Sequence, residues 1–284
     1  MLAIATSVAV VGFATNASCP PLAPIKAMAR TLSQQLIDDR NETKYTVHGL
    51  FGIFGRGDQI PGSSRSYFKD YEDVKVNFMH KHACLLGHRY KQPTVCEVGF
   101  NAGLSALLLL ESIPHARVLS FDLGDFPWAR PADAILRRQY GPARFPGVVF
   151  GDARETITKV ATEERFKCDM VFVDGDKSYQ GRYDALVALL NVSNTHSAVF
   201  MDEVTTQACV DGTYASGADH ARQCAALDAG YWPSVRAYNR ACREGWLSVQ
   251  SCAWPGRHRH DGICLGRFGR RRRAHKRAPT KRKQ

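Results

Sequence analysis

The sequence Glu97-Val98-Gly99-Phe100-Asn101-Ala102-Gly103 decides how the chain folds. It ends an apolar segment, residues 94–98, that is typical of a buried strand, and it leads into an apolar stretch, residues 104–112, that is typical of a helix. Gly99 permits a tight turn and the close approach of a ligand, and Gly103 permits close packing where the helix begins. A strand, a glycine turn and a helix in this order indicate the ligand-binding loop of an α/β fold, although a purely structural turn would use the same residues.

Apolar segments and helical patterns alternate along the chain on both sides of this motif. Strands are expected at residues 94–98, 117–121, 148–150, 170–174 and 198–201, with helices at 71–90, 104–112, 132–139, 154–160 and 179–190. A further helix at 218–228 and strands at 246–252 and 262–267 follow. This order predicts an α/β fold with a Rossmann-like, doubly wound, mostly parallel seven-stranded sheet and an antiparallel closing strand.

The 284 residues divide into four parts. Residues 1–19 form a possible signal or transit segment, because an apolar run is followed by small residues. Processing there implies the secretory pathway or an organelle; without it, a cytoplasmic or nuclear location is expected. Residues 20–69 are a lead-in expected to pack loosely or cover the site. Residues 70–267 form the α/β domain, and residues 268–284 a disordered basic tail.

The formal net charge of +11 is concentrated at the C-terminus. From Arg267 to the end the chain has ten Lys and Arg residues and no acidic one, so the rest of the chain carries about +1. This distribution excludes a strongly basic catalytic face. A nucleic acid is therefore an unlikely partner except through the tail, which is otherwise a solvated end.

The chain has nine cysteines and no C-x-x-C pair, so a zinc ribbon is not expected. Cys96 and Cys168 lie in or beside buried strands and are expected to behave as small apolar residues. Disulfides and reduced thiols are both compatible with the sequence.

Acidic residues stand at the ends of successive strands. Asp122 ends the second strand, where a carboxylate can accept hydrogen bonds from both ribose hydroxyls of a cofactor. Asp152 follows the third strand and can accept from an adenine amino group or cap the next helix. Glu97 can reach the cationic end of a cofactor, directly or through water. A nicotinamide enzyme is disfavoured because G-x-G-x-x-G is absent.

The fourth and fifth strands also end in acids, Asp174 in one case and Asp202 followed by Glu203 in the other. Carboxylates that meet at one sheet edge suit Mg²⁺ or another hard divalent cation, which would orient a substrate hydroxyl and lower its pKa. Lys177 could take the proton. Its pKa, roughly 10.4 when free, would then have to be lowered by burial or nearby positive charge. Alternatively, these carboxylates cap helices and line the pocket without a metal.

Residues 94–204 resemble the core of the class I S-adenosylmethionine (SAM)-dependent methyltransferases. The glycine motif is close to that of many small-molecule O-methyltransferases. Asp174-Gly175-Asp176-Lys177 is similar to the metal-Asp and catalytic-Lys segment of the catechol and caffeoyl-CoA O-methyltransferases. The resemblance implies SAM bound by Glu97, Gly99, Asn101, Gly103, Asp122, Asp152 and Asp174. It also implies a divalent metal on Asp174, Asp202 and Glu203, with Lys177 as general base and Asp174 as its catalytic neighbour.

Two positions depart from the families that the chain resembles. Those families place Asn after the second Asp, where this chain has Glu203. A related group reads Asp-Gly-x-His-x-Tyr, with Lys177 here in place of the His. The resemblance implies O-methylation of a small hydroxylated substrate. No transmembrane helix is expected, because the apolar run at residues 2–14 is too short to span a bilayer. The sequence does not indicate the oligomeric state. The alternative is a nucleic-acid-binding or nucleic-acid-modifying protein that uses the basic tail.

Overall fold

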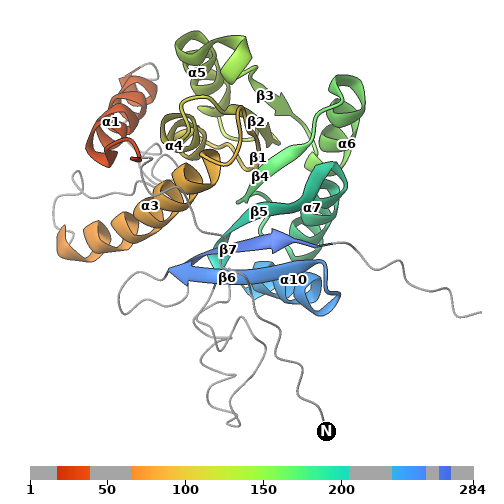
Figure 1. The fold of residues 1–284 in the computed structure, drawn as a ribbon. Helices are drawn as coiled ribbons and strands as arrows, with labels where there is room; N and C mark the ends of the chain where they lie inside the picture. Colours follow the sequence, from red (N-terminus) through yellow and green to blue (C-terminus); the bar gives the residue numbers. More distant parts are fainter. Residues whose placement is uncertain (1–17, 39–64, 205–231, 254–261, 270–284) are drawn as a thin grey trace, which may run out of the picture.

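A computed structural model describes residues 18–38, 65–204, 232–253 and 262–269. Its centre is a seven-stranded sheet in the order β3-β2-β1-β4-β5-β7-β6 (Figure 1). The strands are β1 Thr94–Val98, β2 Arg117–Asp122, β3 Val148–Phe150, β4 Cys168–Val173, β5 Ser193–Val204, β6 Leu247–Ala253 and β7 Gly262–Phe268. The first five are parallel, and β7 runs antiparallel to both β5 and β6. The predicted Rossmann-like fold is confirmed.

Helices cover both faces of the sheet (Figure 1). One face carries α1 (Leu22–Asp38), α3 (Arg65–Gly87), α4 (Leu104–Ser112) and α5 (Ala129–Arg144), and the other carries α6 (Ala153–Glu164), α7 (Tyr179–Val192) and α10 (Trp232–Arg243). Each face has its own apolar core, because the strands of a parallel sheet are buried on both sides. The run Leu107–Leu110 in α4 is fully buried because this helix lies between the sheet and helices α1 and α3.

Helix α1 is part of the core. Ile25, Ala29, Leu32 and Leu36 recur at helical spacing and are all at most 3% exposed. They pack in the same apolar cluster as α4 and α5. The expectation that the lead-in packs loosely is therefore wrong for α1.

The predicted secondary structure agrees with the structure best around the parallel strands. Helix α3 lies where residues 71–90 were expected to be helical, while α10 was not predicted. The helix expected at 218–228, the N-terminal segment up to residue 17 and the tail from residue 270 lie outside the described residues. Within the described ranges, no helix is long and apolar enough to cross a membrane.

Disulfides join three pairs of cysteines among the described residues: Cys19–Cys84, Cys96–Cys168 and Cys252–Cys264. The first ties the segment before α1 to α3, the second joins β1 to β4, and the third joins β6 to β7. Cys96 and Cys168 are fully buried, as expected, but they are bonded to each other rather than acting as separate apolar side chains. The sequence left disulfides and reduced thiols open, because it does not give the distance between two strands.

Candidate active site

The turn between β1 and α4 needs glycine at two positions. Gly99 has a φ of +97°, and a Cβ there would lie 2.5 Å from the carbonyl oxygen of Asp174. Gly103 has a φ of +76°, and a Cβ there would lie 2.7 Å from the ring of Phe100. Any other side chain would therefore be strained at both positions, and at Gly99 it would also push the loop away from the end of β4. These are the turn and packing roles expected from the sequence.

The carboxylate of Asp122 holds this turn against the end of β2. One oxygen accepts the backbone N–H groups of Phe100 and Asn101 at 2.8 and 3.0 Å, and the other accepts that of Gly124 at 2.7 Å. A carboxylate has about four lone-pair sites, so capacity for ribose hydroxyls remains. Asp122 thus both shapes the loop and faces the cavity described next.

A cavity of about 370 Å³ opens at the carboxyl ends of β1, β2 and β4. This volume lies within the roughly 300–1,000 Å³ usual for ligand sites. Its walls include the predicted residues Gly99, Asn101, Asp122, Asp152, Asp174 and Lys177. The structure therefore brings together side chains from four separate segments, as expected where parallel strands end at one edge.

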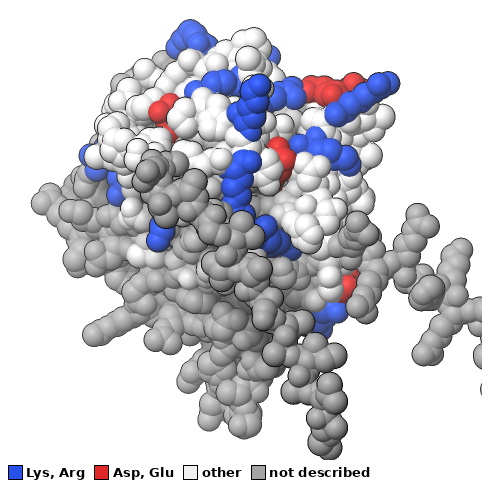
Figure 2. Space-filling view, viewed as in Figure 1, with Lys and Arg blue, Asp and Glu red and all other residues white. Residues whose placement is uncertain are grey.

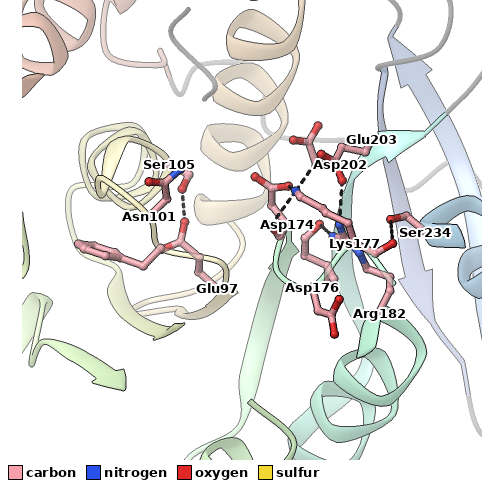
Figure 3. Close-up of polar contacts among 12 residues, drawn as sticks. Glu97, Asn101, Ser105, Asp174, Asp176, Lys177, Arg182, Asp202, Glu203 and Ser234 are labelled. Atoms are coloured by element: carbon pink, nitrogen blue, oxygen red, sulfur yellow. Dashed lines mark hydrogen bonds and ion pairs between the residues drawn. The ribbon is translucent and has the colours of Figure 1, made fainter. Parts of the chain in front are cut away.

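Glu97 and Gly103 are not part of the cavity wall. Glu97 is fully buried, and its carboxyl group accepts a hydrogen bond from the hydroxyl of Ser105 (Figure 3) and another from the hydroxyl of Ser120. Burial raises its pKa from 4.5 to about 7, although the two serine hydrogen bonds oppose the shift. Glu97 therefore links β1 to α4 and β2 beside the loop through these two hydrogen bonds. Its burial does not favour the direct contact with a ligand that was expected from the sequence.

Two apolar residues at the cavity were missed by the sequence analysis. Leu123 and Phe126 line it and remain 58% and 46% exposed. The ring of Phe126 stacks on that of Trp128 at 5.0 Å, and the Trp128 indole N–H donates to the Asn101 amide oxygen at 2.5 Å. An exposed apolar pair beside a strand-ending acid offers a surface for a flat ring. The sequence signal that could have found them is a pair of apolar residues, Leu123 and Phe126, in the polar segment that follows Asp122.

Asp152 caps helix α6, which is the second of the two roles that the sequence allows for it. Its carboxylate accepts the backbone N–H of Arg154 at 2.9 Å, and the Arg154 Nε lies 2.9 Å from both carboxylate oxygens. The same pairing lowers the pKa of Asp152. An adenine amino group would therefore share this carboxylate with Arg154 or displace it.

Acidic and basic side chains are paired at the ends of β4 and β5. The Lys177 ammonium lies 2.5 Å from Asp174 Oδ1 and 2.8 Å from Glu203 Oε1 (Figure 3). Arg182, which is fully buried, contacts the other oxygen of Glu203 at 2.9 Å and donates to the Val173 carbonyl at 2.7 Å. Glu203 itself has a φ of +59° and forms a bulge against β7.

Helix α3 contributes a cation to the same cluster. The Lys75 ammonium contacts Asp202 Oδ1, and the two side chains are only 7% and 6% exposed. The predicted carboxylates Asp174, Asp202 and Glu203 thus do lie at one edge. Each of them, however, is already engaged by a basic side chain.

The expected metal site does not fit this arrangement. A divalent cation needs several oxygens that converge on one point. Among the described residues, only Cys19, Cys84 and His88 bring three candidate ligand atoms within 4.8 Å of one another, and two of these cysteines form a disulfide. Asp174, Asp202 and Glu203 do not converge in this way. Ammonium and guanidinium groups stand against them and would repel a cation.

The general-base role predicted for Lys177 is not favoured by its surroundings. Burial lowers the pKa of this ammonium, but the carboxylates of Asp174 and Glu203 outweigh it, so that the pKa is raised overall. Lys177 is therefore a protonated hydrogen-bond donor at neutral pH. Burial, followed by Asp174, raises the pKa of Glu203 to about 7, which makes Glu203 the group in the cluster best matched to accept a proton.

Comparisons with known proteins agree with this site. Residues 96–204 match a family model described as a methyltransferase domain. The fold is similar to that of an O-methyltransferase from Bacillus cereus in complex with SAH, with 16% identity over 86% of this chain and 99% of that one and a TM-score of 0.51. It is also similar to the O-methyltransferase TomG from Streptomyces achromogenes, involved in tomaymycin synthesis and bound to SAM, with 16% identity, 85% and 90% coverage and a TM-score of 0.54. No curated protein matches the sequence.

At these identities the two solved structures show the fold, while the family match assigns methyl transfer to residues 96–204. The sheet order and the cavity at the carboxyl edge agree with a methyltransferase domain in residues 96–204. The glycine turn and Asp122 form part of the wall of the cavity at this edge.

Proposed function

We propose that this methyltransferase transfers the methyl group of SAM to a hydroxyl oxygen of a small molecule. The observation that carries the proposal is the Lys177 ammonium, which lines the cavity beside Asp174 while Glu203 contacts it at 2.8 Å. A fixed positive charge next to a carboxylate of raised pKa suits an acceptor that loses a proton as it reacts.

The positions of the cavity residues suggest how the cofactor lies. Leu123 and Phe126 offer an apolar surface for adenine, and Asp122 offers acceptors for the ribose hydroxyls. Asp174 and Lys177 stand at the β4 end of the same cavity. In this orientation the sulfonium methyl group points toward β4, so the acceptor would approach beside Lys177.

The chemical step follows from the charges in this cluster. Lys177 donates a hydrogen bond to the acceptor oxygen and stabilises the negative charge that develops there. The hydroxyl proton passes to the Glu203 carboxylate. The oxygen then forms a bond to the methyl carbon as the carbon–sulfur bond breaks, and the sulfur keeps the electron pair. The sulfonium becomes a neutral thioether, and no metal takes part.

Two further points support an oxygen acceptor of small size. The two solved structures of similar fold are both O-methyltransferases by name, and we carry that acceptor atom over as part of the proposal. Figure 2 shows Lys and Arg side chains dispersed over the described surface, with acidic and neutral residues between them. Among the described residues of that face, the basic side chains form no continuous track of the kind that a nucleic acid substrate needs.

The test is methyl transfer from SAM with a deuterated methyl group to a panel of small phenols, sugars and matched amines, followed by mass spectrometry. We expect the label in a methyl ether and loss of transfer in Lys177→Met, with SAM affinity within about twofold of wild type because the cofactor contacts remain.

In wild type, kcat should rise as the pH passes the Glu203 pKa of about 7, because the carboxylate form of Glu203 accepts the proton. Label found only on amines, or full activity in Lys177→Met, would refute the proposal.

A further inference from the structure

The site contains an internal cation where the resembling families imply a metal. Six charged side chains meet at the ends of β4 and β5, and three of each sign are present. The pairs are Lys75 with Asp202, Lys177 with Asp174 and Glu203, and Arg182 with Glu203. The formal charges of the cluster therefore sum to zero without an added ion.

Lys75 is a basic member of this cluster to which the methyl-transfer proposal gives no role. It comes from α3, which precedes the Rossmann-like core in sequence, and its side chain is 7% exposed. Val76 and Met79 on the same helix are at most 1% exposed and fix α3 in the apolar core. A buried ammonium is costly unless a carboxylate compensates it, so the contact with Asp202 is a built feature of the fold.

We propose that the Lys75 ammonium replaces the divalent cation at Asp202 and makes this site independent of metal. The idea rests on the proposed function only in that methyl transfer is one of its measurements. Lys75 acts as a positioning residue: it neutralises Asp202, which would otherwise stand unbalanced beside Asp174 and Glu203. These two carboxylates then remain available to Lys177.

The effect of Lys75 extends to the cavity wall. Although burial opposes the shift, the pKa of Asp174 is lowered by Lys177, Arg182 and Lys75 together. Asp174, which lines the cavity, is thus kept ionised by fixed positive charges of the chain. A divalent cation would supply the same kind of field, and the lysine supplies it permanently.

The substitution Lys75→Met tests this directly, because it keeps most of the side-chain length and removes the charge. It leaves the cluster with one uncompensated negative charge. We expect Lys75→Met to gain binding of Mn²⁺, measured by electron paramagnetic resonance with SAH present, while wild type binds none. We also expect kcat to fall on the order of 10- to 100-fold, because Asp202 and its neighbours lose their alignment. Lys81→Met, on the exposed side of the same helix, is the matched control and should change neither quantity.

Wild-type protein decides the question even if Lys75→Met does not fold. Methyl transfer should be unaffected by EDTA dialysis and by added Mg²⁺, and Mn²⁺ should not bind. Stoichiometric Mn²⁺ binding by wild type, or activity lost in EDTA and restored by Mg²⁺, overturns the proposal, as does unchanged kcat in folded Lys75→Met. If no acceptor is methylated while wild type still excludes Mn²⁺, the methyl-transfer proposal fails and the role of Lys75 stands.

Discussion

The buried carboxyl group of Glu97 makes the stability of the protein depend on pH. Its pKa is raised from 4.5 to about 7, so the folded state binds a proton more tightly than the unfolded state does. The free energy of unfolding should therefore fall as the pH rises from about 4.5 to about 7, and the loss is on the order of 3 kcal/mol. Below the unfolded pKa this contribution is fully present.

The change Glu97→Gln removes this dependence. We expect the variant to keep its stability between pH 5 and pH 8 better than wild type, because the amide has no charge to bury. Thermal melts across this pH range measure the difference. Glu163→Gln, on the exposed side of α6, should leave the pH profile as it is in wild type. Parallel profiles for Glu97→Gln and wild type would show that Glu97 is ionised at low cost.

The sequence predicted where several site residues lie, but not their charge states. The motif correctly placed Asp122, Asp174 and Lys177 at one cavity, because parallel strands end at the same edge. The charge state of Lys177 was not predictable, since it depends on Glu203, which arrives from another strand. The φ of +59° at Glu203 suits Asn, the residue that the resembling families place there. Its contacts with Lys177 and Arg182 accompany this less favoured backbone conformation.

At the scale of elements, the contact between the β1–α4 turn and β4 is the feature that forms the cavity. In Gly99→Ala the new Cβ would lie 2.5 Å from the Asp174 carbonyl oxygen, and that backbone cannot yield easily. We expect stability to fall by about 1–3 kcal/mol and SAM affinity to fall with it. Denaturant unfolding and SAM titration measure the two effects.

Gly245→Ala is the matched control for Gly99→Ala. Gly245 also has a positive φ, +76°, but no atom of the described residues lies within 4 Å of a Cβ built there. It should show the backbone strain alone and leave SAM affinity unchanged. If the two variants lose SAM affinity equally, the contact with β4 does not shape the site.

Elements with a regular apolar pattern were predictable, and those fixed by distant contacts were not. The parallel strands and α4 follow from continuous apolar runs. Helix α10 was missed because Arg and Asn residues stand between the apolar residues that it buries, Val235, Ala237, Tyr238 and Ala241. β5 begins at Ser193, five residues before the predicted start at residue 198. The prediction missed these first residues because they are polar and largely exposed. The contact of α3 with β5 through Lys75 joins segments far apart in sequence, and no local pattern indicates it.

For the whole molecule, the three disulfides found among the described residues predict the kind of compartment in which the protein folds. Such bonds form and persist in oxidising environments. We therefore propose that the chain reaches an oxidising compartment, in agreement with a processed N-terminus. Peptide mass spectrometry without reducing agent should recover the pairs Cys19–Cys84, Cys96–Cys168 and Cys252–Cys264, and reduction should lower the melting temperature. Fully reduced cysteines in protein from its native source would contradict this.

The basic tail is the other whole-molecule question, because nearly all of residues 268–284 lie outside the described part of the chain. We expect deletion of residues 270–284 to leave methyl transfer to small molecules unchanged, since the site is built from residues 75–203. Any retention of nucleic acid should disappear with the tail and weaken steeply with salt in the full chain. Nucleic-acid binding that survives the deletion would place a second basic surface elsewhere.

The most direct measurement of the central claim is a calorimetric titration of SAM into the full-length protein. We expect saturable binding at one site per chain and no binding of NAD⁺. In Asp122→Asn the affinity should fall about 10- to 100-fold, because a charged acceptor is removed from the cavity. Absence of SAM binding to folded wild type, or equal affinity in Asp122→Asn, would contradict a SAM site at the carboxyl edge of this sheet.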